Sequence, residues 1–259
     1  GQDPITPKEM REYIRVVRKL LAGEEVDYTY RGRTAEIQFM QQDRNYVNLK
    51  DPVPIYVAAN GPLALAAAGE LADGWMLAGK GGNEIGYGQG EIKNAAAKIN
   101  RPLDNFKNFV TTSACVMKPG EKLTSERVVN QTGSMVTTFL HFNYEIWEKA
   151  GRKDEMILPE FADMWPDYIR RVESINMPEK SRFRAVHEGH GTFLQEQERK
   201  FITPKAIKSS CLVGEPDDII EQIRKLEKAG VHEVALLPPA DFQRDVFRDF
   251  AEQVMPHFQ

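Results

Sequence analysis

A turn of small residues between a strand and a helix is the stretch of this sequence best suited to bind an anion. Ile55 to Ala59 is a short apolar run, which is typical of a strand buried on both faces. Pro62 suits the first position of a helix, and we expect Asn60 to cap that helix. Backbone amides at a helix start attract phosphate, although such a turn can also be only a connection. The turn consists of Ala58, Ala59, Asn60 and Gly61.

Two histidines three positions apart, His187 and His190, are the second candidate group. Histidines at this spacing can share a metal on a helix, but Gly189 weakens a helix and no third ligand stands at a suitable spacing. We therefore predict no metal and assign both histidines to substrate binding, with polar loop residues as the alternative. The acidic residues of Glu215-Pro-Asp-Asp218 are predicted to cap a helix.

The turn belongs to a strand–helix–strand unit. Leu63 to Leu71 is rich in alanine and leucine and predicts a helix, and Trp75 to Ala78 predicts a second buried strand. Such a unit forms a parallel strand pair. Gly79 to Gly90 contains six glycines, which predicts a mobile or ligand-covering loop.

The remaining elements follow from the spacing of apolar residues. A long insertion with apolar faces of its own is typical of a lid or a substrate-binding layer. Helices are expected over residues 6–22, 91–100, 127–150, 160–176 and 246–258, with one more after Asp218; a hairpin over 26–39; strands over 54–59, 75–78, 106–116 and 231–237; and a helical insertion over 118–208.

Composition narrows the class of protein. The chain has 259 residues, of which 41% are hydrophobic and 28% charged, with a net charge of −4, so nucleic acid and anionic membrane are not expected partners. Two cysteines without CxxC spacing argue against a disulfide framework or a zinc site. With no long apolar segment and no signal peptide, we expect a cytoplasmic protein. The recurring strand–helix unit predicts an α/β fold with a parallel sheet or barrel.

Two blocks of the sequence resemble the luciferase-like monooxygenase superfamily. They are PVPIYVAANGPLALAAAGELADGWMLAGKG and LVGEPDDIIEQIRKLEKAGVHEVALLPP, and the tail ADFQRDVFRDFAEQVMP is similar as well. The resemblance covers about two-thirds of the chain. It implies a TIM (β/α)8 barrel and is strongest to the branch that depends on coenzyme F420, which includes enzymes like F420-dependent glucose-6-phosphate dehydrogenase and methylenetetrahydromethanopterin reductase.

The resemblance also implies roles for individual residues. The turn from Ala58 to Gly61 would hold the cofactor phosphate, and we assign Gly79 to cofactor binding too. Lys80 matches a lysine that holds the substrate phosphate in the sugar-phosphate branch, although it can also be a surface lysine. That branch has an arginine where this chain has Ser209, which argues against glucose 6-phosphate as the substrate.

The implied activity is hydride transfer between the deazaflavin and a small organic substrate. An FMN-dependent monooxygenase on the same scaffold is one alternative, and a non-catalytic cofactor-binding or truncated paralogue is another. In the family, four strands that carry catalytic residues come before the helix that residues 6–22 resemble, so the catalytic residues are not assigned here. We expect a single barrel domain over 1–259, incomplete at its N-terminus, with residues before Gly1 or a second copy of the chain, as in a homodimer, completing the barrel.

Overall fold

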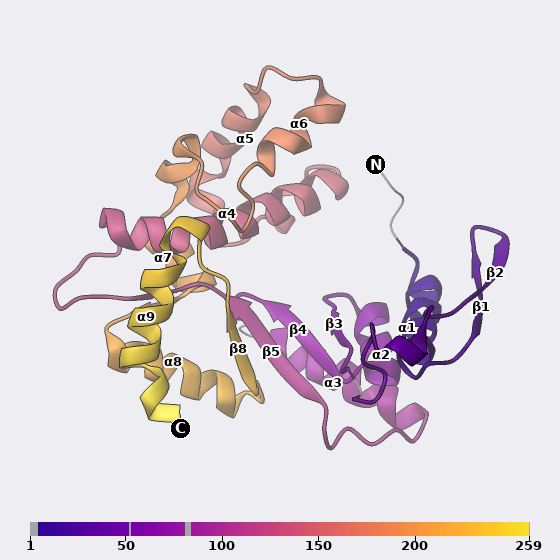
Figure 1. The fold of residues 1–259 in the computed structure, drawn as a ribbon. Helices are drawn as coiled ribbons and strands as arrows, with labels where there is room; N and C mark the ends of the chain where they lie inside the picture. The colour runs from indigo at the N-terminus through magenta and orange to yellow at the C-terminus, as the bar shows by residue number, and fades with distance from the viewer. Residues whose placement is uncertain (1–4, 52, 81–83, 259) are drawn as a thin grey trace. The chain divides into compact units, whose positions relative to one another are not determined.

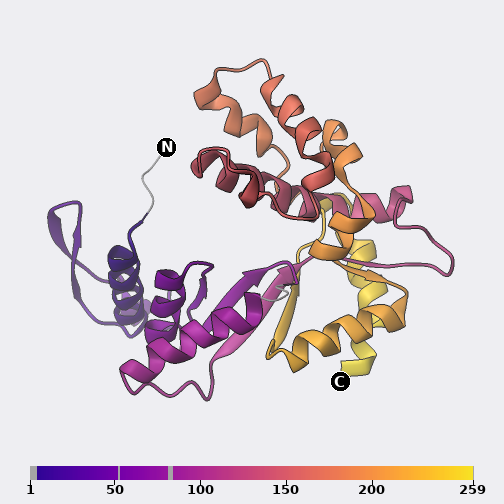
Figure 2. The ribbon, with the colours of Figure 1, turned by 180° about the vertical axis from the view of Figure 1, so that it is seen from behind.

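The computed structural model describes residues 5–51, 53–80 and 84–258. These residues divide into two compact units, shown in Figures 1 and 2. The first unit is Gly1–Leu77 with Gly82–Phe109, and the second is Ala78–Gly81 with Val110–Gln259.

The first unit surrounds the predicted strand–helix–strand motif, and all three of its predicted elements are confirmed. Its elements in chain order are α1 (Pro7–Leu21), β1 (Val26–Tyr30), β2 (Arg33–Ile37), the 3-10 helix η1 (Gln42–Arg44), β3 (Tyr56–Ala58), α2 (Pro62–Leu71), β4 (Gly74–Ala78), α3 (Glu84–Lys98) and the start of β5 (Lys107–Thr112).

The strands β3 and β4 run parallel, with Val57 opposite Trp75. Next to β4, the amide of Lys107 donates a hydrogen bond to the carbonyl of Asp73 at 3.1 Å, which brings in β5 as the next strand. Trp75 is 2% exposed and its indole Nε1 donates to the carbonyl of Ala59 at 2.8 Å. This buried bond ties the second strand to the turn that follows the first.

The predicted hairpin is also confirmed. The strands β1 and β2 are antiparallel, and Arg31 and Gly32 between them both have positive φ angles, of 50° and 79°. Two such residues form the tight turn that matches the twist of a hairpin. The start of α1 is capped as predicted, since Thr6 and Glu9 form a reciprocal capping box.

The predicted loop from Gly79 to Gly90 is wrong over most of its length, because α3 already begins at Glu84. Part of this stretch, residues 81–83, lies outside the described residues. Gly88 is buried, and a Cβ atom there would lie only 2.3 Å from the ring of Trp75. The glycine therefore permits close packing of the helix on a tryptophan rather than a flexible loop.

The second unit contains the end of β5 and the elements after it. They are β6 (Ala114–Val116), α4 (Glu126–Lys149), η2 (Asp154–Met156), η3 (Ala162–Met164), α5 (Trp165–Glu173), α6 (Glu179–Val186), η4 (Glu196–Phe201), α7 (Pro204–Ser210), β7 (Leu212–Gly214), α8 (Pro216–Lys228), β8 (Glu233–Leu236), η5 (Ala240–Phe242), α9 (Gln243–Gln253) and η6 (Met255–Phe258).

The predicted third strand is divided in two at Ser113. Its first part, β5, lies beside β8, with the amide of Leu237 donating to the carbonyl of Thr112 at 2.8 Å. Its second part, β6, pairs in parallel with β7. The sequence did not predict β7 as a strand, because its three residues Leu212–Gly214 lead directly into the cap of α8. That cap is confirmed, since Glu215 and Asp218 form a capping box.

The helices of the insertion bury their aromatic side chains together. The helix α4 agrees with its predicted bounds to within one residue, and Figures 1 and 2 show α5 and α6 on the same side of it. Trp147 of α4 and Trp165 of α5 meet edge to face at 5.6 Å. The second predicted helix, over 160–176, is shorter than expected because η3 precedes α5, and α6 lies in a segment expected to be only polar.

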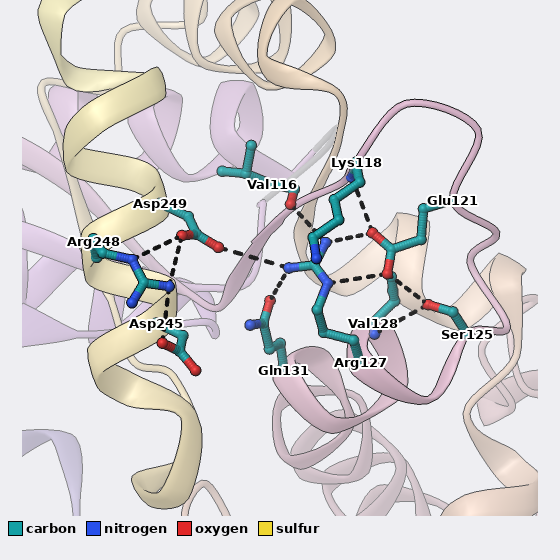
Figure 3. Close-up of polar contacts among 10 residues, drawn as sticks. All are labelled: Val116, Lys118, Glu121, Ser125, Arg127, Val128, Gln131, Asp245, Arg248 and Asp249. Carbon is teal, nitrogen blue, oxygen red and sulfur yellow. Dashed lines mark hydrogen bonds and ion pairs between the residues drawn. The ribbon is translucent and has the colours of Figure 1, made fainter.

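Arg127 joins three parts of the second unit through hydrogen bonds and ion pairs (Figure 3). Its guanidinium pairs with Glu121 in the loop before α4, with Nε 3.0 Å from Oε1. It also donates to the carbonyl of Val116 at 2.9 Å and lies 3.7 Å from Asp249 of α9. These contacts hold α9, β6 and α4 together. Every helix in the described part of the chain is too short or too polar to span a bilayer.

Candidate functional site

The turn predicted to bind phosphate lies in the first unit. The strand β3 ends at Ala58, Ala59 is 2% exposed, and Asn60 and Gly61 face solvent. The expectation that Asn60 caps α2 is wrong, because Gly61 occupies the cap position and no side chain bonds the first amides of the helix. Pro62 has no amide hydrogen and the amide of Ala64 donates to the carbonyl of Gly61 at 3.1 Å, so in the first turn of α2 the amide of Leu63 is the one left for an external acceptor among these three described residues.

Gly61 has space around it. Its φ of −92° and ψ of 156° suit any residue, and a Cβ atom placed there would meet no heavy atom within 4 Å. The protein itself therefore does not require glycine at this position. A ligand that approaches the backbone closely would require it, which is why this position tests the turn.

Gly79 and Lys80 lie in the second unit. Gly79 has a φ of 72°, and its missing Cβ would lie 2.7 Å from the ring of Phe139, so packing alone explains this glycine. Lys80 is half-buried, and its Nζ lies 3.2 Å from Oε1 of Gln222 on α8. Burial lowers the pKa of Lys80, and nearby Lys208 acts in the same direction. A desolvated ammonium whose acceptor within the described residues is the neutral Gln222 gains from an added anion.

The two predicted histidines lie together in the second unit, and His141 of α4 joins them. His187 follows α6, and Gly189, with a φ of 80°, turns the chain toward His190. The ring centroids of His187 and His190 are 5.1 Å apart, and those of His141 and His190 are 5.4 Å apart. The Nδ1 atoms of His141 and His190 are separated by 3.1 Å, and Nε2 of His187 lies 3.2 Å from Glu145.

A buried carboxylate contacts Nε2 of His141. Glu198 is 1% exposed, and both of its oxygens lie 3.1 Å from Nε2 of His141, which is 0% exposed. Arg171 supplies a positive charge, with Nη2 3.3 Å from Oε1 of Glu198. Buried charged and polar groups require close partners, and His141, Glu198 and Arg171 supply these to one another.

The sequence did not point to His141, Glu198 or Glu145. His141 and Glu198 lie 57 positions apart, and only the tertiary fold brings them together. The sequence did contain a feature that could have singled out His141. It is a polar residue among the apolar residues Phe139, Leu140 and Phe142 of an amphipathic helix. Within the described ranges no group of three histidine, cysteine or acidic residues is arranged to hold a metal ion.

A groove of about 790 Å³ lies beside Arg171, the partner of the buried Glu198. Its described lining includes Arg170, Arg171, Arg199 and Lys200 together with two acidic residues, Asp167 and Glu196. None of the residues predicted from the sequence is among those that line it. Most of its cations have acidic or amide partners, since Arg170 pairs with Asp167 and Arg199 with Glu196 and Asn130.

Comparisons with known proteins give this geometry a context. The sequence profile of the luciferase-like monooxygenases matches residues 5–233. A 5,10-methylenetetrahydromethanopterin reductase from Archaeoglobus fulgidus is 25% identical over 236 residues, which are 90% of this chain and 60% of that protein. This chain therefore spans about 60% of the length of that curated relative.

Solved structures share the fold. The coenzyme F420-dependent tetrahydromethanopterin reductase from Methanopyrus kandleri aligns with a TM-score of 0.59 at 18% identity, over 100% of this chain and 66% of that chain. The oxygenating constituent of 3,6-diketocamphane monooxygenase from Pseudomonas putida, in complex with FMN, aligns with a TM-score of 0.51 at 14% identity, over 98% and 64%. These similarities confirm the predicted fold class, the α/β fold of the luciferase-like TIM-barrel enzymes.

Proposed function

Because the chain belongs to the luciferase-like monooxygenase family, we propose that the protein is an oxidoreductase that uses coenzyme F420. It transfers a hydride between the deazaflavin and a small organic substrate, while the protein positions both and shapes their electrostatic surroundings. The observation that carries this proposal is the open turn at Gly61 in a chain whose relatives include F420-dependent reductases.

The residues of the turn would hold the phosphate of the cofactor. Ala58, Ala59, Asn60 and Gly61 lead into the N-terminus of α2, which has no side-chain cap, and the bond from Trp75 to Ala59 keeps the backbone in place. FMN also carries a phosphate, so an FMN-dependent monooxygenase remains the second candidate, favoured by the FMN-bound structural relative. The absorbance spectrum of the cofactor that binds distinguishes the two.

Lys80 would bind an anionic group of the substrate or of the cofactor tail. Its lowered pKa and its contact with a neutral acceptor, Gln222, support this role. Ser209, at the position where the sugar-phosphate branch has an arginine, bonds the carbonyl of Ala206 in its own helix at 3.0 Å. Because a serine stands where that branch has an arginine, bidentate binding of a phosphate is lost, and we propose that the substrate is not glucose 6-phosphate.

The substitution Gly61→Leu tests the proposal. Since the side chain enters open space at an unstrained backbone position, the fold should stay intact while the space for a phosphate is lost. We expect affinity for F420 to fall by about tenfold or more, the value of one charge-assisted hydrogen bond. The matched control is Gly86→Leu on α3, where a Cβ atom also meets nothing within 4 Å.

Equal F420 affinity of Gly61→Leu and the parent chain would mean that the turn is only a connection. Turnover by the purified chain with F420 would count against a non-catalytic paralogue. The predicted homodimer and cytoplasmic location also stay predictions, and light scattering coupled to size-exclusion chromatography tests the first.

A further inference from the structure

Three histidine rings of the second unit join a surface loop to the helix α4. His190 lies in the loop after α6, and its Nδ1 atom is 3.1 Å from Nδ1 of His141 on α4. The ring centroid of His187, at the start of this loop, lies 5.1 Å from that of His190 and 5.5 Å from that of His141. Histidine is the side chain whose charge changes near neutral pH, so we expect this contact to depend on pH.

The contact between His141 and His190 tolerates only one positive ring. A hydrogen bond between two imidazole nitrogens needs a proton on one of them and a lone pair on the other. If both rings were imidazolium, each Nδ1 would carry a proton, and the two protons would point at each other across 3.1 Å. Two positive rings in contact also repel each other. The contact is therefore lost when both rings are protonated, whichever ring donates at neutral pH.

Glu198 stabilises the first positive charge on this pair of rings. Both of its oxygens lie 3.1 Å from Nε2 of His141 in a fully buried site, and a nearby carboxylate favours a positive charge. Arg171 of α5, with Nη2 3.3 Å from Oε1 of Glu198, weakens this effect. The second positive charge would fall on His190, which contacts the other nitrogen of the His141 ring.

The surroundings of His190 disfavour this second charge. Partial burial of its ring lowers the pKa of His190, and His141 and His187 lower it further. Glu198 and Glu145, whose carboxylate lies 3.2 Å from Nε2 of His187, act in the opposite direction but less strongly. Because the folded-state pKa of His190 is lowered from 6.5, the folded contact is fully favoured above this pH and loses stability as the pH falls below it.

Of the two rings in the contact, His190 is the one that can move. His141 is 0% exposed and is held by Glu198, whereas His190 lies at the surface. Gly189 and Gly191, on either side of His190, have φ angles of 80° and 68°. Glycine reaches many backbone conformations without steric cost, so these two positions allow the ring to swing away from α4.

The loop has separate anchors at its two ends. Nδ1 of His187 lies 2.9 Å from the carbonyl oxygen of Phe183 on α6. At the other end, the amide of Ala240 donates to the carbonyl of Thr192 at 2.9 Å. Release of His190 would therefore open residues 188–191 and leave the elements on either side in place.

We propose that His141 and His190 form a pH-sensitive latch, which holds residues 188–191 closed on α4 near neutral pH and releases them in acid. On acidification the pair takes its second proton from solvent, the hydrogen bond between the two Nδ1 atoms is lost, and the loop opens. Protonation is reversible, so the loop closes again as the pH rises. This inference concerns the second unit by itself and holds whether or not the protein uses F420.

Hydrogen exchange of the full chain, measured by mass spectrometry of its peptides, tests the latch without cofactor or substrate. The amides of Thr192 and Phe193 donate to the carbonyl of Gly189 at 2.8 and 2.9 Å, so their exchange reports opening of the loop. The measured rates are corrected for the intrinsic effect of pH on exchange. From about pH 7.5 to about pH 5.5 the corrected rate should rise, by up to about tenfold per pH unit for the uptake of one proton.

The variant His190→Gln removes the latch and keeps a polar side chain at this surface position. Glutamine can still hydrogen-bond to His141 but takes up no proton in this pH range, so the corrected exchange of the loop should no longer change with pH. The matched control is His257→Gln, which removes an exposed histidine of η6 in the same unit and should keep the response of the parent chain.

A local latch predicts no parallel change in α8 of the same unit. The latch is refuted if the corrected exchange of the loop does not change with pH, if the parent and His190→Gln respond equally, or if α8 opens in parallel with the loop. An NMR titration, in which the signal missing from His190→Gln identifies His190, should also give this residue a pKa below 6.5. A pKa of 6.5 or higher would contradict the proposal.

Discussion

Replacing Glu121 by glutamine should weaken the second unit in a way that depends on pH. Glu121 accepts from Arg127, from the hydroxyl of Ser125 at 2.9 Å and from the amide of Lys118 at 3.0 Å (Figure 3). Hydrogen bonds from Arg127, followed by those from Lys118 and Ser125, lower the pKa of Glu121 from 4.5 to about 2. The side chain is 13% exposed, so solvent screens these contacts only in part.

The magnitude follows from this shift. A pKa that falls from 4.5 to about 2 corresponds to about 3 kcal/mol of stabilisation when the carboxylate is ionised, at about 1.4 kcal/mol per pKa unit. Screening at the edge of the network and the retained bonding of glutamine reduce the loss, so we expect about 1–2 kcal/mol near neutral pH. Because the folded pKa lies below the unfolded one, this stabilisation is present above about pH 4.5 and is lost as the pH falls toward 2.

Urea unfolding between pH 2.5 and 7 measures the effect, followed by tryptophan fluorescence, to which Trp147 and Trp165 in the core of this unit contribute. The difference in unfolding free energy between the parent and Glu121→Gln should be largest near neutral pH and should shrink in acid. Glu252→Gln, at an exposed position on α9, is the matched control for the loss of one negative charge. A constant difference across this pH range would refute the assignment of the pKa shift to Glu121.

Three further changes test packing and burial. Gly69→Ala would place a methyl group 2.3 Å from the backbone oxygen of Ile92. Thermal unfolding should therefore show the first unit destabilised by about 1–3 kcal/mol. The control Gly90→Ala has open space around it and should not destabilise the unit. Tyr168→Phe removes a buried hydroxyl that has no hydrogen-bond partner in the described part of the chain; unfolding free energy should stay within about 1 kcal/mol of the parent or rise, and a loss above about 2 kcal/mol would reveal a partner. Lys80→Met removes an ammonium whose pKa is lowered by burial, so the unfolding free energy of the unliganded chain should rise at pH 7. This gain should vanish as the pH rises above the unfolded pKa of 10.5. Binding of anionic substrates, measured by titration calorimetry, should weaken.

The sequence predicts elements best where local chemistry and packing agree. The apolar run before Pro62 became β3, the amphipathic stretch from Glu126 became α4, and Thr6 with Glu9 became a capping box. In each case the apolar spacing or the capping residues are local in the chain. The tight turn at Gly32 is local in the same sense, since its backbone geometry favours glycine.

The failures have tertiary causes. The glycines around Gly88 led to the prediction of a loop. The neighbouring sequence does not reveal that the ring of Trp75 occupies the space that a side chain at position 88 would need. The break at Ser113 depends on a long-range partner, because its carbonyl accepts from the amide of Leu212. The candidate site residues show the same difference. The open turn at Gly61 could be predicted from its small residues, whereas the pairing of His141 with Glu198 depends on the folding of the insertion.

Both cysteines of the chain are sealed inside the second unit. Cys115 and Cys211 are each 0% exposed, and burial raises the pKa of each thiol to about 12. The reactive thiolate is therefore scarce at ordinary pH, and alkylating reagents should react slowly with the native chain. Site-directed labelling of this chain therefore does not require replacement of its two cysteines. One cysteine placed on the exposed hairpin and one on α9 would accept a pair of fluorophores or spin labels, and the distance between the two units could be followed directly as cofactor is added.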